Sequence, residues 1–195
     1  MITWSEFERV QPGLAEVGRR ELYQVGIGLG FLATVRPDGG PRVHPVCPVI
    51  SAAGLHVLLV SGPKQADLRR DGRYALHSET CPPPREDDGF AIIGQATEVT
   101  DPSVRAVVRA QIHAERDGNL WPTFDQDALF ELRVARCLLM LTQPDGTFPL
   151  GPTIWRAALR TGREVNPLGR VAPANEDRGH HLRREQAMLD DPRRR

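Results

Sequence analysis

A serine and a lysine stand at the start of a predicted helix, where a phosphate could bind. The apolar run at 55–60 predicts a strand, and SGPKQADLRRD (61–71) predicts a short helix directly after it. We expect Ser61 to cap this helix, Pro63 to suit its first turn and Lys64 to lie just inside it. A helix N-terminus offers free amides and a partial positive charge, so the hydroxyl and the ammonium would complete a site for one phosphate. Taken alone, a motif this short more often marks a solvated surface lysine.

An arginine and a histidine lie close together on the segment PRVHPVCPVI (41–50), which predicts one strand. Side chains alternate along a strand, so Arg42, His44 and Val46 share one face. If this face lines a cleft, it offers a bidentate anion donor and an imidazole that titrates near neutral pH. The alternative is an edge strand whose polar face meets solvent. Proline cannot donate to a ladder, so the prolines of this segment favour an edge position.

Two further groups of residues do not predict a site. The glycines of GIGLG (26–30) follow a predicted helix and open the strand FLATV (31–35), whereas a dinucleotide-binding loop follows a strand and opens a helix. We interpret them as a helix-to-strand connection. His180 and His181 lack a third ligand nearby, so no metal site is expected. Arg69 and Arg70 are interpreted as a solvated helix face.

The order of these segments resembles the flavin-binding split barrels related to pyridoxamine 5'-phosphate oxidase. The shared pattern is a strand, a PDG turn, an RxHPV strand, a strand that ends before SxxK, a DLRRD helix and a further strand. It covers residues 30–110. Late in the chain, Trp155 with Arg156 is similar to the closing segment of the family.

This resemblance implies a homodimeric split barrel with FMN in a groove between the two subunits. Arg42 and Lys64 would hold the FMN phosphate with Ser61 as a neighbour, and residues 44–46 would run along the isoalloxazine ring. His44 would be the side chain to test as a proton donor. Some relatives bind the deazaflavin coenzyme or haem instead. The implied cofactor contacts are Arg42, Val43, His44, Pro45, Val46, Val60, Ser61, Lys64, Trp155 and Arg156, the last two from the partner chain.

The expected function is that of an FMN-dependent oxidoreductase, which passes a hydride through the flavin to or from a small organic substrate. Pyridoxamine phosphate is not the expected substrate. The family's oxidase holds its substrate phosphate with an arginine–leucine–histidine type of motif, and HHLRRE (180–185) is only a loose echo of it. The alternatives are a deazaflavin-dependent reductase on the same fold and a non-catalytic protein that binds flavin or haem.

The strands and helices expected around these residues indicate a mainly β fold, a six-stranded antiparallel split β-barrel with flanking helices. Thr3 with Glu6 is a possible capping box, and Pro12 interrupts the first helix. Asp101 is expected to cap a helix at 103–114. The expected organisation is a helical segment at 1–29, the barrel at 30–158 and a polar arm at 159–195. The expected strands cover 31–35, 41–50, 55–60, 74–79, 90–100 and 129–143, and a proline-rich loop covers 81–89.

Composition narrows the function classes. The chain has 195 residues, and its 25 basic side chains balance 25 acidic ones, which argues against a general nucleic-acid binder. No apolar run approaches the roughly 20 residues of a membrane helix, and the three cysteines form no CxxC pair. We therefore expect a cytoplasmic protein without membrane or nucleic-acid partners. Lys64 is the only lysine, and every other basic side chain is an arginine.

Overall fold

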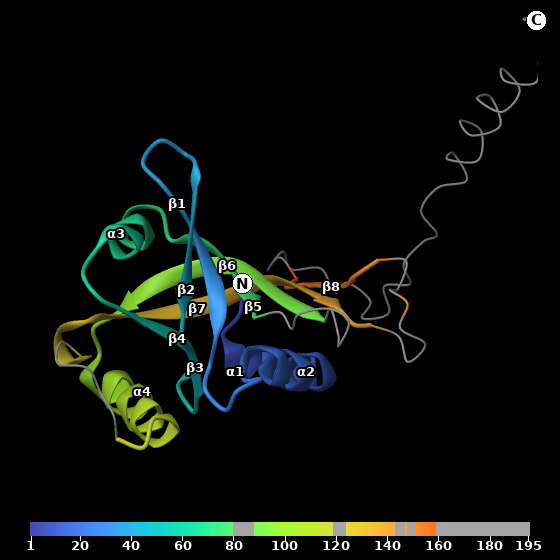
Figure 1. The fold of residues 1–195 in the computed structure, drawn as a ribbon, viewed down its shortest axis with the longest axis horizontal. Coiled ribbons are helices and arrows are strands. Elements are labelled where there is room, and N and C mark those ends of the chain that lie inside the picture. Colours follow the sequence, from blue (N-terminus) through green and yellow to red (C-terminus); the bar gives the residue numbers. More distant parts are fainter. Residues whose placement is uncertain (80–87, 119–123, 143–146, 148–150, 159–195) are drawn as a thin grey trace, which may run out of the picture. The chain divides into compact units, whose positions relative to one another are not determined.

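Two short helices, α1 (Trp4–Val10) and α2 (Pro12–Leu22), open the chain in the computed structural model (Figure 1). The capping box is confirmed, because Thr3 N donates to Glu6 Oε2 at 2.8 Å and Glu6 N donates to Thr3 Oγ1 at 3.2 Å. Pro12 begins the second helix, as expected. The structure describes residues 1–79, 88–118, 124–142, 147 and 151–158, all within the compact unit Met1–Leu159. The predicted arm at 159–195 and most of the loop at 81–89 lie outside these residues.

One curled antiparallel sheet forms the body of the described part, which confirms the mainly β class (Figure 1). Its hydrogen-bonded order is β2-β1-β5-β6-β7-β4-β3, and β8 pairs with β7. The long β7 joins β6, β4 and β8. The strands are β1 (Gly30–Val35), β2 (Pro41–Val46), β3 (Pro48–Ser51), β4 (Gly54–Leu59), β5 (Arg73–Ser78), β6 (Gly89–Val99), β7 (Ala128–Met140) and β8 (Thr153–Arg156).

The described residues form eight strands, so the expected number of six was wrong. One difference is the segment 41–50, which is two strands. β2 pairs with β1 and β3 pairs with β4, with Cys47 between them. The prolines near this point cannot donate to a ladder, so the chain can leave one neighbour and join another. The other difference is β8, which adds residues 153–156 beside β7.

Helices α3 (Pro63–Arg70) and α4 (Pro102–Glu115) follow strands β4 and β6. Asp101 caps α4 as predicted, because its Oδ1 accepts from Ser103 N at 2.8 Å. The predicted cap of α3 was wrong, since the N-cap is Gly62 and no side chain bonds there. The helix begins at Pro63, so Ser61 lies one residue too early in the chain to be the cap. A short 3-10 turn, Phe124–Gln126, precedes β7.

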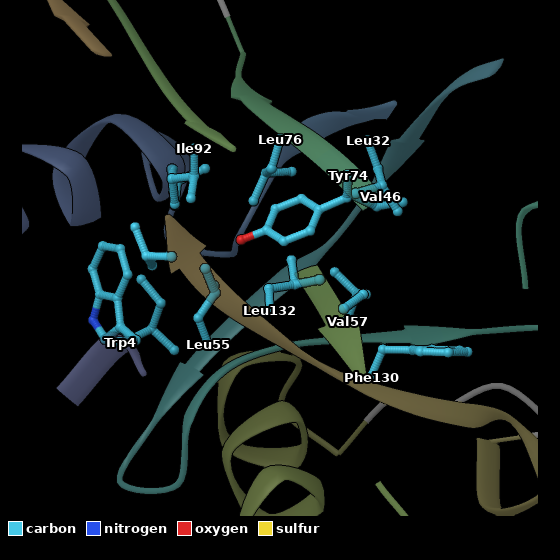
Figure 2. Packing of buried hydrophobic residues seen from close by; sticks show 14 of the residues in the cluster. Trp4, Leu32, Val46, Leu55, Val57, Tyr74, Leu76, Ile92, Phe130 and Leu132 are labelled. Atoms are coloured by element: carbon cyan, nitrogen blue, oxygen red, sulfur yellow. The ribbon is translucent and has the colours of Figure 1, made fainter. Parts of the chain in front are cut away.

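A hydrophobic core fills the inside of the curled sheet, with Trp4 of α1 packed against it (Figure 2). A second, smaller cluster lies between α4 and the strands β3 and β7. Burial of this extent makes the sheet a rigid support for its edge strands. In the part of the chain that the structure describes, no helix is long and apolar enough to span a bilayer. The labelled core residues are Trp4, Leu32, Val46, Leu55, Val57, Tyr74, Leu76, Ile92, Phe130 and Leu132.

Candidate functional site

A cavity of about 280 Å³ lies where β2 turns into β3, beside the end of β4 and the helices α3 and α4. Most of its walls are apolar, and its charged lining residues are Lys64, Glu115 and Arg116. Of the predicted cofactor contacts, the structure brings Pro45, Val46, Val60 and Lys64 together here. The remaining walls come from Ile27, Gly28, Cys47, Val49, Leu58, Leu59 and Ile112.

Lys64 stands in the first turn of α3 and is half-buried in this wall. Among the described residues it makes no hydrogen bond and no ion pair. Ser61 is exposed two residues before the helix and does not line the cavity. The Lys64 ammonium therefore has no ion pair among the described residues, although the Glu115 carboxylate lines the same cavity, and it can pair with a ligand anion.

Arg42 lies next to a buried carboxylate instead of lining the cavity. Its Nε donates to Asp67 Oδ2 at 2.7 Å, and Thr34 Oγ1 donates to the same oxygen at 2.9 Å. Arg70 lies 3.6 Å from the other oxygen. Burial alone would raise the pKa of Asp67, but the hydrogen bonds from Arg42 and Thr34 hold that pKa below its ordinary value. The two predicted phosphate ligands therefore differ in their surroundings.

The sequence matches no family model and no curated protein, but solved structures share its fold. The conserved hypothetical protein Rv2991 from Mycobacterium tuberculosis is 19% identical with a TM-score of 0.53, over 63% of this chain and 81% of that one. A heme binding protein from Mycobacterium smegmatis is 17% identical with a TM-score of 0.53, over 66% and 54%. A Clostridium acetobutylicum protein of the pyridoxinephosphate oxidase family, related to general stress protein 26 of B. subtilis, is 10% identical with a TM-score of 0.50, over 73% and 93%.

The chain has the split-barrel fold of the pyridoxamine 5'-phosphate oxidase-like proteins. In this split barrel the alternation along β2 is as predicted. Arg42 and His44 are half-buried on one face, while Val43 is 58% exposed on the other. β2 is also an edge strand, as the prolines indicated. His44 pairs in register with Leu32 and does not line the cavity.

Trp155 and Arg156 of the split barrel lie on β8 and do not line the cavity of their own chain. The Trp155 ring packs on Phe7 of α1, with 4.9 Å between ring centroids. Arg156 is exposed and pairs in register with Arg136 on β7. Within one chain Trp155 therefore ties β8 to the N-terminal helix. Its predicted approach to the cofactor of a partner subunit remains a prediction.

The end of α4 supplies cavity residues that the sequence analysis missed, Glu115 and Arg116. Glu115 Oε1 accepts from Tyr23 Oη at 3.0 Å and from Gln111 Nε2 at 2.8 Å, so that carboxylate is held by its neighbours. Burial, followed by the nearby Glu115 charge, raises the pKa of Tyr23. Nothing in the local sequence marks these residues, because they reach the cavity only when α4 packs on β3.

Gly28 forms part of the cavity wall for a steric reason. It lies in the connection between α2 and β1, as predicted for the glycines at 26–30. A Cβ at this position would lie 1.8 Å from the Pro48 carbonyl oxygen. Only glycine allows the connection to pass this close to β3.

The surface arginines of α3 are exposed, as expected, but both have partners. Arg69 donates to the Glu98 carboxylate at 2.7 and 2.6 Å, and Arg70 donates to the Val35 carbonyl. These contacts attach α3 to β6 and β1. Among the residues that the structure describes, no group of three histidine, cysteine or acidic side chains could hold a metal ion. His180 and His181 lie outside those residues.

Proposed function

We propose that this chain is an FMN-dependent oxidoreductase whose cavity binds the flavin phosphate at Lys64. The observation that carries the proposal is a half-buried lysine that lines a mostly apolar cavity and has no ion pair in the described part of the chain. The donor set suits the group, because Lys64 and the free amides at the start of α3 both favour a phosphate. The apolar side chains of Pro45 and Val46 in the cavity lining suit an aromatic ring.

The protein's residues would bind and orient the flavin, and the flavin when bound supplies hydride transfer. Lys64 would pair with the phosphate, and Arg42 would add a second cation from β2. The apolar side chains of the cavity would exclude water from the ring. His44, half-buried on the same face as Arg42, is the candidate proton donor.

We further propose that a second copy of the chain covers the outer face of β1, β2, β5 and β6. On this face Val43, Ala33, Ala75 and Ile93 are consecutive partners across the four strands. Val43 is 58% exposed and Ile93 38% exposed, and nearby Phe31 is 38% exposed. An apolar row across an edge of a sheet supports a symmetric dimer more than a solvated surface.

The dimer can be tested by dilution of the flavin-loaded protein. If the groove needs two chains, dissociation measured by sedimentation should release flavin over the same concentration range. A monomer that keeps full flavin affinity would contradict the shared groove.

A non-catalytic haem-binding protein is the second candidate. The observation that favours it is the fold shared with the heme binding protein from Mycobacterium smegmatis, at a TM-score of 0.53. A reductase that uses the deazaflavin coenzyme in the same cavity is a variant of the first candidate, with the same anion site at Lys64.

An absorption spectrum of the protein, as purified and after addition of each cofactor, separates these candidates. Bound FMN gives two bands in the blue and near ultraviolet, the deazaflavin coenzyme gives one, and haem gives a Soret band. We expect uptake of FMN with its two bands. A protein that takes up none of the three would overturn the proposed function.

A further inference from the structure

The middle of α3 carries a buried carboxylate, that of Asp67, which is the first residue of the DLRRD segment. Asp67 is only 3% exposed and faces the sheet. Its Oδ2 accepts both from Arg42 Nε at 2.7 Å and from Thr34 Oγ1 at 2.9 Å, while Arg70 lies 3.6 Å from Oδ1. A buried charge with this many donors is held in one place, because each hydrogen bond to a charged group is short and strong.

The hydrogen bond to Asp67 uses only the Nε atom of the Arg42 guanidinium. Among the described residues, the two terminal nitrogens of Arg42 make no hydrogen bond. The Arg42 side chain keeps 27% of its surface exposed. Because the guanidinium is planar and rigid, fixing Nε also fixes the direction in which the two terminal nitrogens donate.

The same face of α3 carries Lys64 one turn before Asp67, since residues three apart on a helix are neighbours. Arg42 therefore meets α3 one turn below the lysine that lines the cavity. A phosphate beside Lys64 would have a second, oriented donor group on the strand next to it.

We propose that Asp67 is a positioning residue, which holds Arg42 so that its terminal nitrogens face the phosphate monoester of the bound ligand. This inference rests on the proposed function. It assigns no contact between Asp67 and the ligand. The Asp67 carboxylate offsets part of the positive charge near the phosphate. Any gain in phosphate affinity must therefore come from the orientation of Arg42.

An attachment of α3 to the sheet would be the simpler role for this ion pair, but α3 has other attachments. Arg69 bonds Glu98 on β6, Arg70 bonds the Val35 carbonyl on β1, and Leu68 is 3% exposed in the core. α3 therefore keeps several attachments to the sheet that do not involve Arg42. This leaves orientation of the guanidinium as the specific effect of Asp67.

The test compares the full chain with Asp67→Asn, measuring dissociation constants for FMN and for riboflavin, which has the same ring without the phosphate. We expect Asp67→Asn to weaken FMN about 10-fold, which corresponds to about 1.4 kcal/mol, and to leave riboflavin unchanged. Arg42→Lys keeps a cation beside Asp67 but loses the planar fork, so it should weaken FMN without affecting riboflavin. Glu98→Gln removes the comparable ion pair on the other side of α3 and should change neither constant.

Three results would overturn the inference. The first is an FMN affinity of Asp67→Asn that is equal to or higher than that of the wild type. The second is weaker binding of both FMN and riboflavin, which would indicate a structural role for Asp67. Asp67→Asn combined with Arg42→Ala should be no weaker than Arg42→Ala alone, and additive losses would also contradict the inference. A wild-type chain that binds no FMN would instead overturn the proposed function, and this inference with it.

Discussion

Lys64 on α3 and Arg42, which contacts α3 from β2, are two cations whose surroundings differ. Lys64 lines a mostly apolar cavity and has no ion pair in the described part of the chain, whereas Arg42 is bonded to a carboxylate that is 3% exposed. Both residue types suit a phosphate, so residue type alone assigns them the same role. In the proposed function Lys64 would supply charge to a ligand, while Arg42 also bonds a buried carboxylate of the fold.

Removal of Lys64 tests the binding side of this comparison and should give the largest effect. Lys64→Ala leaves a phosphate without its cation in a half-buried site, so FMN should bind more weakly by about 2–5 kcal/mol, as in truncated charge pairs. Isothermal titration at moderate salt measures the change. Arg69→Ala, on the same helix but paired with Glu98, is the matched control and should bind FMN normally. An unchanged constant for Lys64→Ala would return Lys64 to an ordinary surface lysine.

Removal of Arg42 tests the structural side. Arg42→Ala deprives buried Asp67 of its closest donor, so the free energy of unfolding should fall by about 1–3 kcal/mol. Lys64→Ala should leave it nearly unchanged, because Lys64 has no hydrogen bond or ion pair among the described residues. Urea denaturation of both variants gives the two values. Equal losses of stability would show that the two cations do not differ as the geometry indicates.

Acid titration sharpens the same contrast with a smaller effect. Arg42 and Thr34 lower the pKa of Asp67 in the fold, so its contribution to stability is complete above the unfolded value of roughly 3.9. That contribution is lost as the pH falls through the folded value. The stability difference between the wild type and Asp67→Asn should therefore shrink below about pH 4. Lys64→Ala should follow the wild type, and a pH-independent difference would contradict the charged state of Asp67.

The smallest expected change belongs to Lys64→Arg. An arginine keeps the charge but replaces a compact ammonium with a planar fork, so FMN should bind more weakly than to the wild type and more tightly than to Lys64→Ala. Normal FMN affinity in this variant would mean that a lysine has no special role in a chain whose other basic residues are all arginines.

Local patterns predicted the parts of the fold that depend on neighbouring residues. Thr3 with Glu6 and Asp101 with Ser103 formed the expected caps, because a cap needs only a few adjacent residues. The strand predicted at 41–50 became β2 and β3, since the choice of pairing partner is made by distant strands. Ser61 did not cap α3, because the helix begins at Pro63 and Gly62 occupies the N-cap position.

The same limit applies to the residues of the candidate cavity. Lys64, Pro45, Val46 and Val60 meet at one cavity as the motif order suggested. Glu115 and Arg116 were missed, because only the packing of α4 brings them there. The DLRRD segment reads as surface charge, and the burial of Asp67 becomes visible only when α3 lies on the sheet. Motif spacing therefore grouped four residues that line one cavity, but it did not reveal the partners of each charged side chain.

The single lysine allows the central claim to be tested directly. Reductive methylation with ¹³C-formaldehyde labels Lys64 and the N-terminal amine alone, so the Lys64 signal can be followed by NMR during titration with FMN or riboflavin. A phosphate beside the ammonium should shift the Lys64 signal with FMN and leave it nearly unchanged with riboflavin. No shift at saturating FMN, or an equal shift with riboflavin, would contradict a phosphate site at Lys64.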